Sequence, residues 1–317
     1  MRGERPLRSH GLPTADERTR VPSVCAVVVT YNRAELLHEC LNALQAQSVP
    51  VSILVVNNAS TDDTAEVLDR HRDHIDVVDL PENVGGAGGF TRGLKAAMES
   101  AAEYFWILDD DTIPDADCLE ALLQADNDAR ELGSRPAFTA SRVVWSDGRR
   151  HPMNQGMIDD RHDHAEVAAS VRCVALKAAS FVSVLVPRSA VETYGYPIED
   201  FFIWGDDVEY TSRLSFDAPG LLVPSSVATH KTAYYETKVG ARYYYRARNW
   251  LWIVRFSPAF RSERRKLLIR HLRGVVGTLA SNRTREVWGA AARGLRDGLT
   301  KRPGTADIRW PHGSQGA

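Results

Sequence analysis

Between residues 24 and 108, short runs of β-branched and aromatic residues alternate with segments of helical periodicity. The apolar runs predict four strands, VCAVVVT (24–30), SILVVN (52–57), IDVVDL (75–80) and YFWIL (104–108). Helices are predicted between them around residues 37–44, over residues 60–71 with Ser60 as N-cap, and over residues 89–101. This alternation with short links predicts an α/β fold with a mostly parallel central sheet.

Polar residues follow each predicted strand, in the segments 30–33, 57–60, 83–86 and 109–111. Ligands of such sheets bind beyond the carboxyl ends of the strands, so these four segments predict a binding crevice. The glycine fingerprint of a dinucleotide site is absent after the first strand, where Thr30-Tyr31-Asn32-Arg33 stands, and no GxxxxGK[ST] motif occurs. A nucleotide would therefore be held in another way.

Three adjacent carboxylates, Asp109, Asp110 and Asp111, end the fourth predicted strand. One interpretation is a helix N-terminus with acidic residues in its first turn. The other is a divalent cation site, because Asp109 and Asp111 are spaced so that both can reach one Mg²⁺ or Mn²⁺ ion.

A second acidic group and a histidine occur later in the chain. The run FFIWGDDVEY (201–210) contains Asp206 and Asp207, and VATHKTAYY (227–235) contains His230. Aspartates and a histidine from separate segments can form a facial ligand set around one cation. The cluster DDRHDH (159–164) also has metal-ligand residue types, but a solvated loop is the expected outcome for it.

The net charge of −2 conceals two segments of opposite charge. Residues 231–317 hold 19 Lys and Arg against 5 Asp and Glu, whereas residues 1–230 hold 20 against 36. A basic segment of this kind predicts an anionic partner, and a membrane surface or an anionic substrate is favoured over nucleic acid because no nucleic-acid recognition motif is present. The segment 261–279 is predicted to be a helix that either rests on an anionic membrane or packs with a charged outer face.

The bulk composition predicts a cytoplasmic protein. Hydrophobic residues make up 44% of the chain, and no apolar run reaches the ~20 residues of a membrane span. The four cysteines form no CxxC pair, which argues against zinc and against a disulfide framework. Residues 1–21 are polar without the apolar centre of a secretory signal and are predicted to be a flexible tail.

The order of VVVTYNR, VVNNASTDDT, NVGGAGGF, ILDDDTIP, FIWGDDVEY and a downstream histidine resembles that of the family 2 glycosyltransferases. More narrowly, it resembles the bacterial galactofuranosyltransferases and rhamnosyltransferases, over roughly residues 23–250. The resemblance implies the GT-A fold, a sugar-nucleotide donor, a divalent cation and an inverting mechanism. It also implies three parts of the chain: the tail 1–21, a catalytic domain 22–235 and a helical, basic segment 236–317.

The resemblance also implies roles for individual residues. Asp109, Asp111 and His230 would bind Mn²⁺ or Mg²⁺, and Asp207 would deprotonate the acceptor hydroxyl. Asp206 and Trp204 would contact the acceptor, although Trp204 is equally compatible with a core position. The residues implied to bind the donor are Thr30, Arg33, Asn58, Gly85, Gly86, Gly88, Gly89, Arg92 and Asp110.

Asn57-Asn58 replaces the aspartate that many family members have at the end of the second strand. An amide can pair with a pyrimidine through both a donor and an acceptor, so UDP and dTDP both remain open as the nucleotide. The expected acceptor is a saccharide or a polyprenyl-linked glycan, reached in the cytoplasm or at the inner face of the plasma membrane.

Two other functions compete with glycosyl transfer. A metal-dependent phosphatase of the haloacid-dehalogenase type uses Asp-x-Asp-x-Thr, but here Thr112 comes one position early and the motif follows the fourth strand instead of the first. A non-catalytic nucleotide-sugar-binding protein is the second alternative, and Asp207 argues against it because a binding module needs no base.

Overall fold

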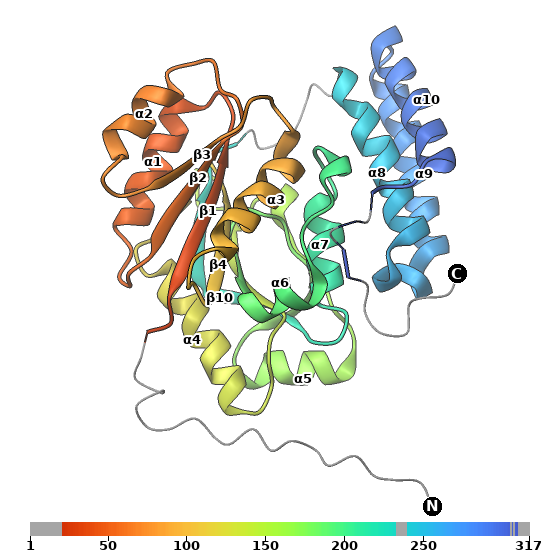
Figure 1. The fold of residues 1–317 in the computed structure, drawn as a ribbon. Coiled ribbons are helices and arrows are strands. Elements are labelled where there is room, and N and C mark those ends of the chain that lie inside the picture. The colour runs from red at the N-terminus through yellow and green to blue at the C-terminus, as the bar shows by residue number, and fades with distance from the viewer. Residues whose placement is uncertain (1–20, 233–239, 305, 307, 310–317) are drawn as a thin grey trace, which may run out of the picture.

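The computed structural model describes residues 21–232, 240–304, 306 and 308–309. Within these residues, ten strands form one sheet in the order β3-β2-β1-β4-β9-β6-β10-β8-β7, and β5 pairs with β10 (Figure 1). The predicted N-terminal tail, except Val21, and the predicted domain boundary after residue 235 lie outside the described residues, so both stay predictions.

The strands are β1 (Val24–Thr30), β2 (Ser52–Asn57), β3 (Asp76–Asp79), β4 (Tyr104–Asp109), β5 (Thr112–Pro114), β6 (Phe138–Val144), β7 (Met157–Ile158), β8 (Val174–Ala178), β9 (Val184–Pro187) and β10 (Gly220–His230). The α-helices are α1 (Ala34–Gln45), α2 (Thr64–His71), α3 (Gly85–Met98), α4 (Cys118–Glu131), α5 (His162–Ser170), α6 (Arg188–Tyr194), α7 (Asp206–Leu214), α8 (Tyr243–Phe256), α9 (Arg264–Ser281) and α10 (Arg285–Thr300). Short 3₁₀ helices are η1 (Pro152–Asn154), η2 (Glu199–Phe201), η3 (Gly240–Arg242) and η4 (Pro258–Glu263).

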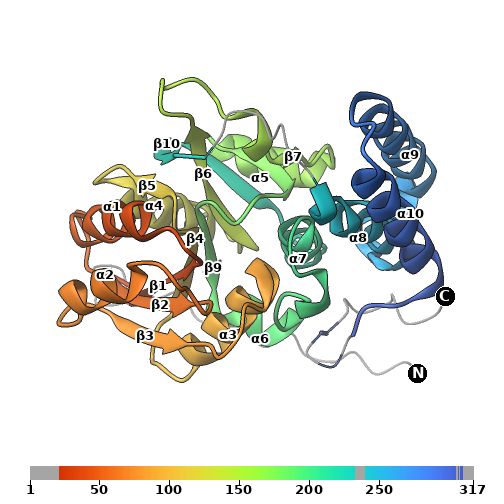
Figure 2. The same cartoon turned by 90° about the horizontal axis from the view of Figure 1, so that it is seen from above.

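Strands β3, β2, β1 and β4 are parallel, as the alternation of strands and helices predicts. Each residue of β1 is buried, because helices cover both faces of this part of the sheet. Cys25 and Val27 of β1 belong to the core shared with α3, α6 and α7, whereas Val24 and Ala26 pack with α1, α2 and α4 (Figure 2). Because successive side chains of a strand point to opposite faces of the sheet, one apolar run contributes residues to both cores.

Two predicted helix starts were wrong. Helix α2 begins at Thr64, and the hydroxyl of Ser60 instead accepts a hydrogen bond from the Asn32 N–H at 3.1 Å, which ties together the loops after β1 and β2. Helix α3 begins at Gly85, four residues earlier than predicted, so the glycine-rich segment forms its first turns.

The C-terminal segment is helical, as predicted, and stands beside α7 in both views (Figures 1 and 2). Ile253 and Trp252 of α8 pack against Phe201 of η2, and an ion pair between Lys177 of β8 and Glu263 of η4 links the segment to the sheet. None of the described helices has the length and apolar character that crossing a membrane requires.

Candidate active site

The three aspartates lie at the carboxyl edge of the parallel strands. Asp109 is the last residue of β4, and Asp110 and Asp111 form the turn to β5. Asp110 is 5% exposed and Asp111 is 1% exposed. Burying several negative charges costs free energy unless positive charge compensates them. The alternative of a solvated helix N-terminus is therefore excluded, because these side chains are buried and lead into a strand.

Arg33, from the loop after β1, supplies part of the compensating charge. Its guanidinium pairs with Asp110 at 3.3 Å and also with Asp111. Burial raises the pKa of Asp110 to about 6 despite this contact, and burial with the neighbouring carboxylates raises the pKa of Asp109 well above its ordinary value. One guanidinium therefore does not neutralise the three adjacent carboxylates.

His230 reaches the aspartates because β10 pairs with β5, in a register that sets His230 opposite Thr112. Its Nε2 lies 2.9 Å from Asp111 Oδ1. Although burial raises the pKa of Asp111, His230 and Arg33 outweigh it and hold that pKa below its ordinary value.

The other ring nitrogen of His230 defines its tautomer. Nδ1 lies 2.8 Å from Asn154 Oδ1, and since an amide oxygen only accepts, Nδ1 is the donor. Nε2, the other ring nitrogen, faces Asp111 Oδ1, so these two atoms are placed where they could share one cation.

The donor set fits a divalent cation. One ligand atom from each of Asp109, Asp111 and His230 lies within 4.8 Å of the others. Across the described residues, this is the one group of three or more His, Cys, Asp or Glu side chains that could hold a metal ion. Two carboxylates and an imidazole suit Mn²⁺ or Mg²⁺, whose ligands are mainly hard oxygens.

A pocket of about 730 Å³ opens beside this cation site. The second acidic group lies in the same pocket, because Asp206 and Asp207 occupy the first turn of α7 and line the wall. The pocket is lined by Val29, Tyr31, Arg33, Asn58, Asn83, Gly85, Gly86, Phe90, Asp109, Asp110, Asp111, Met153, Asn154, Ser180, Phe181, Val182, Phe202, Ile203, Trp204, Asp206, Asp207, His230, Thr232 and Arg242.

Asp206 and Asp207 have protonation behaviour unlike that of Asp111. Burial, reinforced by Asp207, raises the pKa of Asp206 to about 8. Burial also raises the pKa of Asp207 to about 6, although backbone N–H groups, including that of Val208 at 2.8 Å, favour its charged form. Near neutral pH the pair therefore holds about one proton, with Asp207 the more ionised member.

An irregular loop, residues 201–205, presents the pocket's aromatic wall. Phe202 and Trp204 have φ of 63° and 64°, a left-handed conformation that costs free energy for residues with a Cβ. Phe202 stacks on Tyr245, with ring centroids 4.7 Å apart, and the guanidinium of Arg242 lies 5.0 Å from the Trp204 ring centroid. Trp204 is thus part of the pocket wall, and its contact with an acceptor stays a prediction.

Arg248 and Asn249 of α8 hold this loop in place. Asn249 Nδ2 lies 2.9, 2.8 and 2.8 Å from the carbonyl oxygens of Phe201, Ile203 and Trp204. Arg248 donates to the carbonyl oxygens of Asp200 and Phe201 and, through Nε, to Asn249 Oδ1. The C-terminal segment thereby fixes the wall of the pocket.

Asn58 and the first two glycines of α3 line the pocket next to this loop. The Asn58 amide accepts from the Val84 N–H at 2.9 Å and donates to the Gly85 carbonyl at 3.0 Å. Gly85 has φ of 75°, and a Cβ there would overlap the carbonyl oxygen of Phe202. Asn58 thus positions the glycine turn, because both ends of its amide are already bonded.

Four residues implied to bind the donor lie outside the pocket wall. Thr30 is fully buried at the end of β1, and Arg92 pairs with Glu199 at 3.2 Å. Gly88 and Gly89 face Val84 and Val29, where a Cβ would clash, so they serve close packing of α3. Because α3 starts at Gly85, its helical periodicity turns Gly88 and Gly89 away from the pocket.

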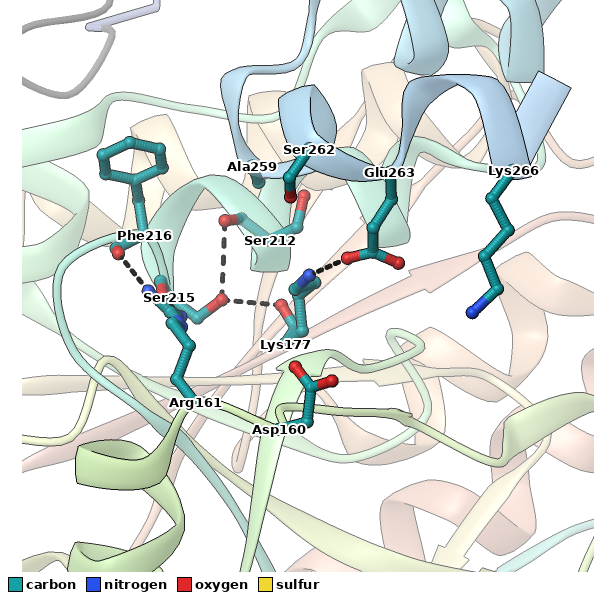
Figure 3. Close-up of a pocket in the computed structure, with 10 residues that line it drawn as sticks. All are labelled: Asp160, Arg161, Lys177, Ser212, Ser215, Phe216, Ala259, Ser262, Glu263 and Lys266. Carbon is teal, nitrogen blue, oxygen red and sulfur yellow. Dashed lines mark hydrogen bonds and ion pairs between the residues drawn. The ribbon is translucent and has the colours of Figure 1, made fainter.

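The DDRHDH cluster is not the expected solvated loop but an internal ion-pair group, because Asp159 and His164 are buried and His162 begins α5. His164 Nδ1 lies 2.9 Å from Asp159, which also pairs with Arg161. Arg161 borders a second pocket, of about 450 Å³, between α7, β8 and the start of α9 (Figure 3). Its guanidinium donates to the carbonyl oxygens of Ser215 and Phe216 at 2.7 Å each, so this charge is already bonded.

Sequence reasoning missed Asn154 as a partner of His230 and Asn249 as a partner of the loop 201–205. Asn154 follows a polar loop without periodicity, and its contact depends on strand pairing far along the chain. Asn249 stands next to Arg248 in the aromatic segment RYYYRARNW. This pair of polar side chains is the one feature of the sequence that could have indicated a structural role.

The chain is an α/β sheet with a candidate divalent-cation donor set and a pocket at the carboxyl edge of its parallel strands. Residues 25–181, just under half of the chain, match the model of glycosyl transferase family 2. Among curated proteins, it is 29% identical over 210 residues to galactofuranosyltransferase GlfT1 of Mycolicibacterium smegmatis, covering 62% of this chain and 66% of that protein. It is 26% identical over 204 residues to poly-β-1,6-N-acetyl-D-glucosamine synthase of Staphylococcus epidermidis, covering 61% and 46%. The chain thus spans just under two thirds of the first of these relatives and less than half of the second.

Solved structures agree on the fold. The S. aureus TarS 1–349 complex with UDP matches with a TM-score of 0.60 and 14% identity, over 87% of this chain and 80% of that one. The mannosyltransferase PcManGT of Pyrobaculum calidifontis, in complex with GDP-Man and Mn²⁺, matches with a TM-score of 0.53 and 19% identity, over 89% and 82%. The chain has the GT-A fold that the sequence predicts.

Proposed function

We propose that the chain is an inverting, metal-dependent glycosyltransferase, which moves galactofuranose or rhamnose from a nucleoside-diphosphate donor to a glycan or lipid-linked saccharide. The observation that carries the proposal is a single pocket with two acidic groups of different character. Asp109 and Asp111 share one wall with His230, and Asp206 and Asp207 share another.

Asp109, Asp111 and His230 would hold Mn²⁺ or Mg²⁺ at the donor diphosphate. When bound, the cation stabilises the negative charge that develops on the leaving diphosphate. Asp110 and Arg33 complete this wall, and Arg33 can turn from the carboxylates to the diphosphate because its side chain is 44% exposed.

Asp207 would act as the general base. A pKa of about 6 leaves its carboxylate mostly ionised at neutral pH, so it can accept the proton of the acceptor hydroxyl. Asp206, with a pKa of about 8, would stay protonated and donate a hydrogen bond to the acceptor. Asp207 lines the same pocket as the cation site, so it could accept the acceptor's proton during an in-line displacement, which inverts the anomeric carbon.

The names of the relatives support parts of this proposal. GlfT1 is named a galactofuranosyltransferase, TarS was solved with UDP and PcManGT with Mn²⁺. They favour UDP-galactofuranose, while dTDP-rhamnose stays the alternative donor. Since the Asn58 amide is bonded to the glycine turn, the nucleotide base would be recognised by other groups of the pocket.

The four cysteines are free thiols, which supports a reducing cytoplasm as the site of action. A polyprenyl-linked acceptor would also bring the enzyme to the inner face of the plasma membrane.

The test is transfer and donor binding measured on the same variants. Asp207→Asn should lower kcat by about 10²–10⁴-fold and leave UDP-sugar affinity nearly unchanged, because it removes the base but no donor contact. Asp109→Ala should weaken donor binding in Mn²⁺. Asp160→Asn, an exposed carboxylate at the second pocket, is the matched control and should change neither.

Each rival has a distinct outcome. Equal loss of donor binding and transfer in Asp207→Asn would remove the assigned role of the base. Full biological activity of that variant would favour a non-catalytic nucleotide-sugar-binding protein. Phosphate release from simple phosphate esters without an acceptor would favour a metal-dependent phosphatase.

A further inference from the structure

Helix α9 buries one stripe of side chains and exposes the opposite one. Leu267, His271 and Val275, spaced four residues apart, are buried, and His271 Nε2 donates to the Ala247 carbonyl of α8 at 3.1 Å. This stripe accounts for how α9 is attached to the C-terminal helices (Figure 2).

Three apolar residues lie on the outer side of α9. Ile269 is 43% exposed, Leu272 43% and Val276 67%. Their spacing of three and four residues places them on one stripe of the helix surface. Exposed apolar residues are common singly, but an ordered stripe of three on one helix needs a partner to exclude water.

The apolar stripe is flanked by cations. Arg265, Lys266, Arg270 and Arg273 are exposed, and α9 contains no aspartate or glutamate from Arg264 to Ser281. Arg265, Lys266 and Arg273 have no ion-pair partner in the described part of the chain. A helix face that is merely solvated normally mixes both signs of charge. This outer face, residues 265, 266, 269, 270, 272, 273 and 276, is called the α9 face below.

We propose that the α9 face is a docking surface for an anionic lipid bilayer. Apolar side chains would enter the boundary between headgroups and acyl chains, while the Arg and Lys stems lie along it with their charges at the lipid phosphates. The rest of the charge distribution agrees, because residues 231–317 are basic and residues 1–230 are acidic. An anionic surface would attract the first and repel the second, which orients the molecule.

Other occupants suit this face less well. A second copy of the chain would bring two sets of four cations together, which is repulsive. A nucleic acid would use the cations but leave the aliphatic stripe without a partner, because its bases stack on aromatic side chains. The inference is consistent with the lipid-linked acceptor of the proposed function and does not depend on glycosyl transfer.

The experiment is cosedimentation of the full chain with phosphatidylcholine vesicles, with and without phosphatidylglycerol. We expect binding only to the anionic vesicles, weakening as salt is added. Removing one cation, as in Arg273→Gln, should weaken binding about fivefold at low ionic strength. Val276→Glu, which puts a negative charge into the apolar stripe, should abolish binding.

Matched controls come from the exposed surface of the catalytic half. Leu132→Glu changes a residue that is 64% exposed, close to the 67% of Val276, and Arg135→Gln removes an exposed cation. Both should bind vesicles like the unmodified chain, and all variants should keep its thermal unfolding temperature and its transfer rate to a water-soluble acceptor.

Three outcomes would overturn the proposal. The first is binding to neutral vesicles as strong as binding to anionic vesicles. The second is a loss of vesicle binding in the control variants as large as in the α9 variants. The third is self-association that Val276→Glu removes, in a chain that does not bind vesicles. Tight binding of a DNA or RNA oligonucleotide, with no binding to anionic vesicles, would replace the bilayer by a nucleic acid. If an α9 variant loses vesicle binding but keeps its transfer rate to the water-soluble acceptor, membrane docking is tested independently of the proposed function.

Discussion

Replacing Asn249 with alanine tests whether α8 maintains the catalytic pocket. Its amide group faces three carbonyl oxygens of the loop 201–205, and its own oxygen accepts from Arg248 Nε at 2.9 Å. The two N–H groups and the oxygen amount to about three hydrogen bonds, each contributing about 1 kcal/mol net. Carbonyl groups left unpaired in a buried site add to the loss, so we expect destabilisation of about 3–5 kcal/mol.

The loss should appear in both stability and catalysis. In a chain of this size, 1 kcal/mol corresponds to roughly 2 °C, so Asn249→Ala should unfold roughly 6–10 °C lower in a calorimetric scan. Phe202 and Trp204 are held in left-handed conformations that relax once the amide is gone. Because Asp206 and Asp207 follow this loop directly, kcat should fall by more than about tenfold below the new unfolding temperature.

Asn127→Ala is the control, since that amide is exposed and bonds only Glu131 on the same helix, at 3.1 Å. It should change stability by less than about 0.5 kcal/mol. If Asn249→Ala unfolds at the original temperature and transfers sugar at the original rate, the loop is held by its own packing and the argument from α8 is refuted.

Three further predictions concern the same pocket. Gly85→Ala should destabilise the protein by more than about 2 kcal/mol because the added Cβ meets a backbone oxygen at a positive φ, whereas Gly86→Ala, with that oxygen 4.0 Å away, should leave urea unfolding nearly unchanged. Asn154→Leu should weaken Mn²⁺ binding, measured by calorimetry, about 10–100-fold, because His230 loses the partner that orients its ring. Unchanged affinity would show that another group orients the ring. The kcat of transfer should fall as pH drops through about 6, since protonated Asp207 cannot accept a proton; a midpoint near 8 would assign the base to the preceding aspartate.

The strands that support the pocket could be predicted because their signal is local. VCAVVVT and SILVVN are bounded by polar residues and buried on both faces, so β1 and β2 begin and end where the residue pattern changes. The helix starts were less predictable. Ser60 resembles an N-cap, but its hydroxyl accepts from the Asn32 N–H of another loop, an interaction that short-range propensity does not contain.

The same distinction separates the predicted site residues from the missed ones. Asp109 and Asp111 are identifiable because adjacent carboxylates at a strand end require compensation. Asn58 was expected to face the nucleotide, yet its amide holds the glycine turn, because the chain folds back over it. Asn154 and Asn249 act through contacts between segments distant in sequence, so single-residue patterns carry almost no information on them.

Asp111 and Asp207 differ in pKa because of the charges that surround them. Asp111 touches His230 and Arg33, and its interactions with these two side chains hold its pKa below the ordinary value in spite of burial. Asp207 is buried with only backbone N–H groups to favour its charged form, so its pKa rises to about 6. A permanently ionised carboxylate suits a cation ligand, and a carboxylate that can take up a proton near neutral pH suits a base. Arg33 and His230 thus account for the low pKa of Asp111 alone, because burial and the neighbouring carboxylates raise the pKa of Asp109 and Asp110 in the same group.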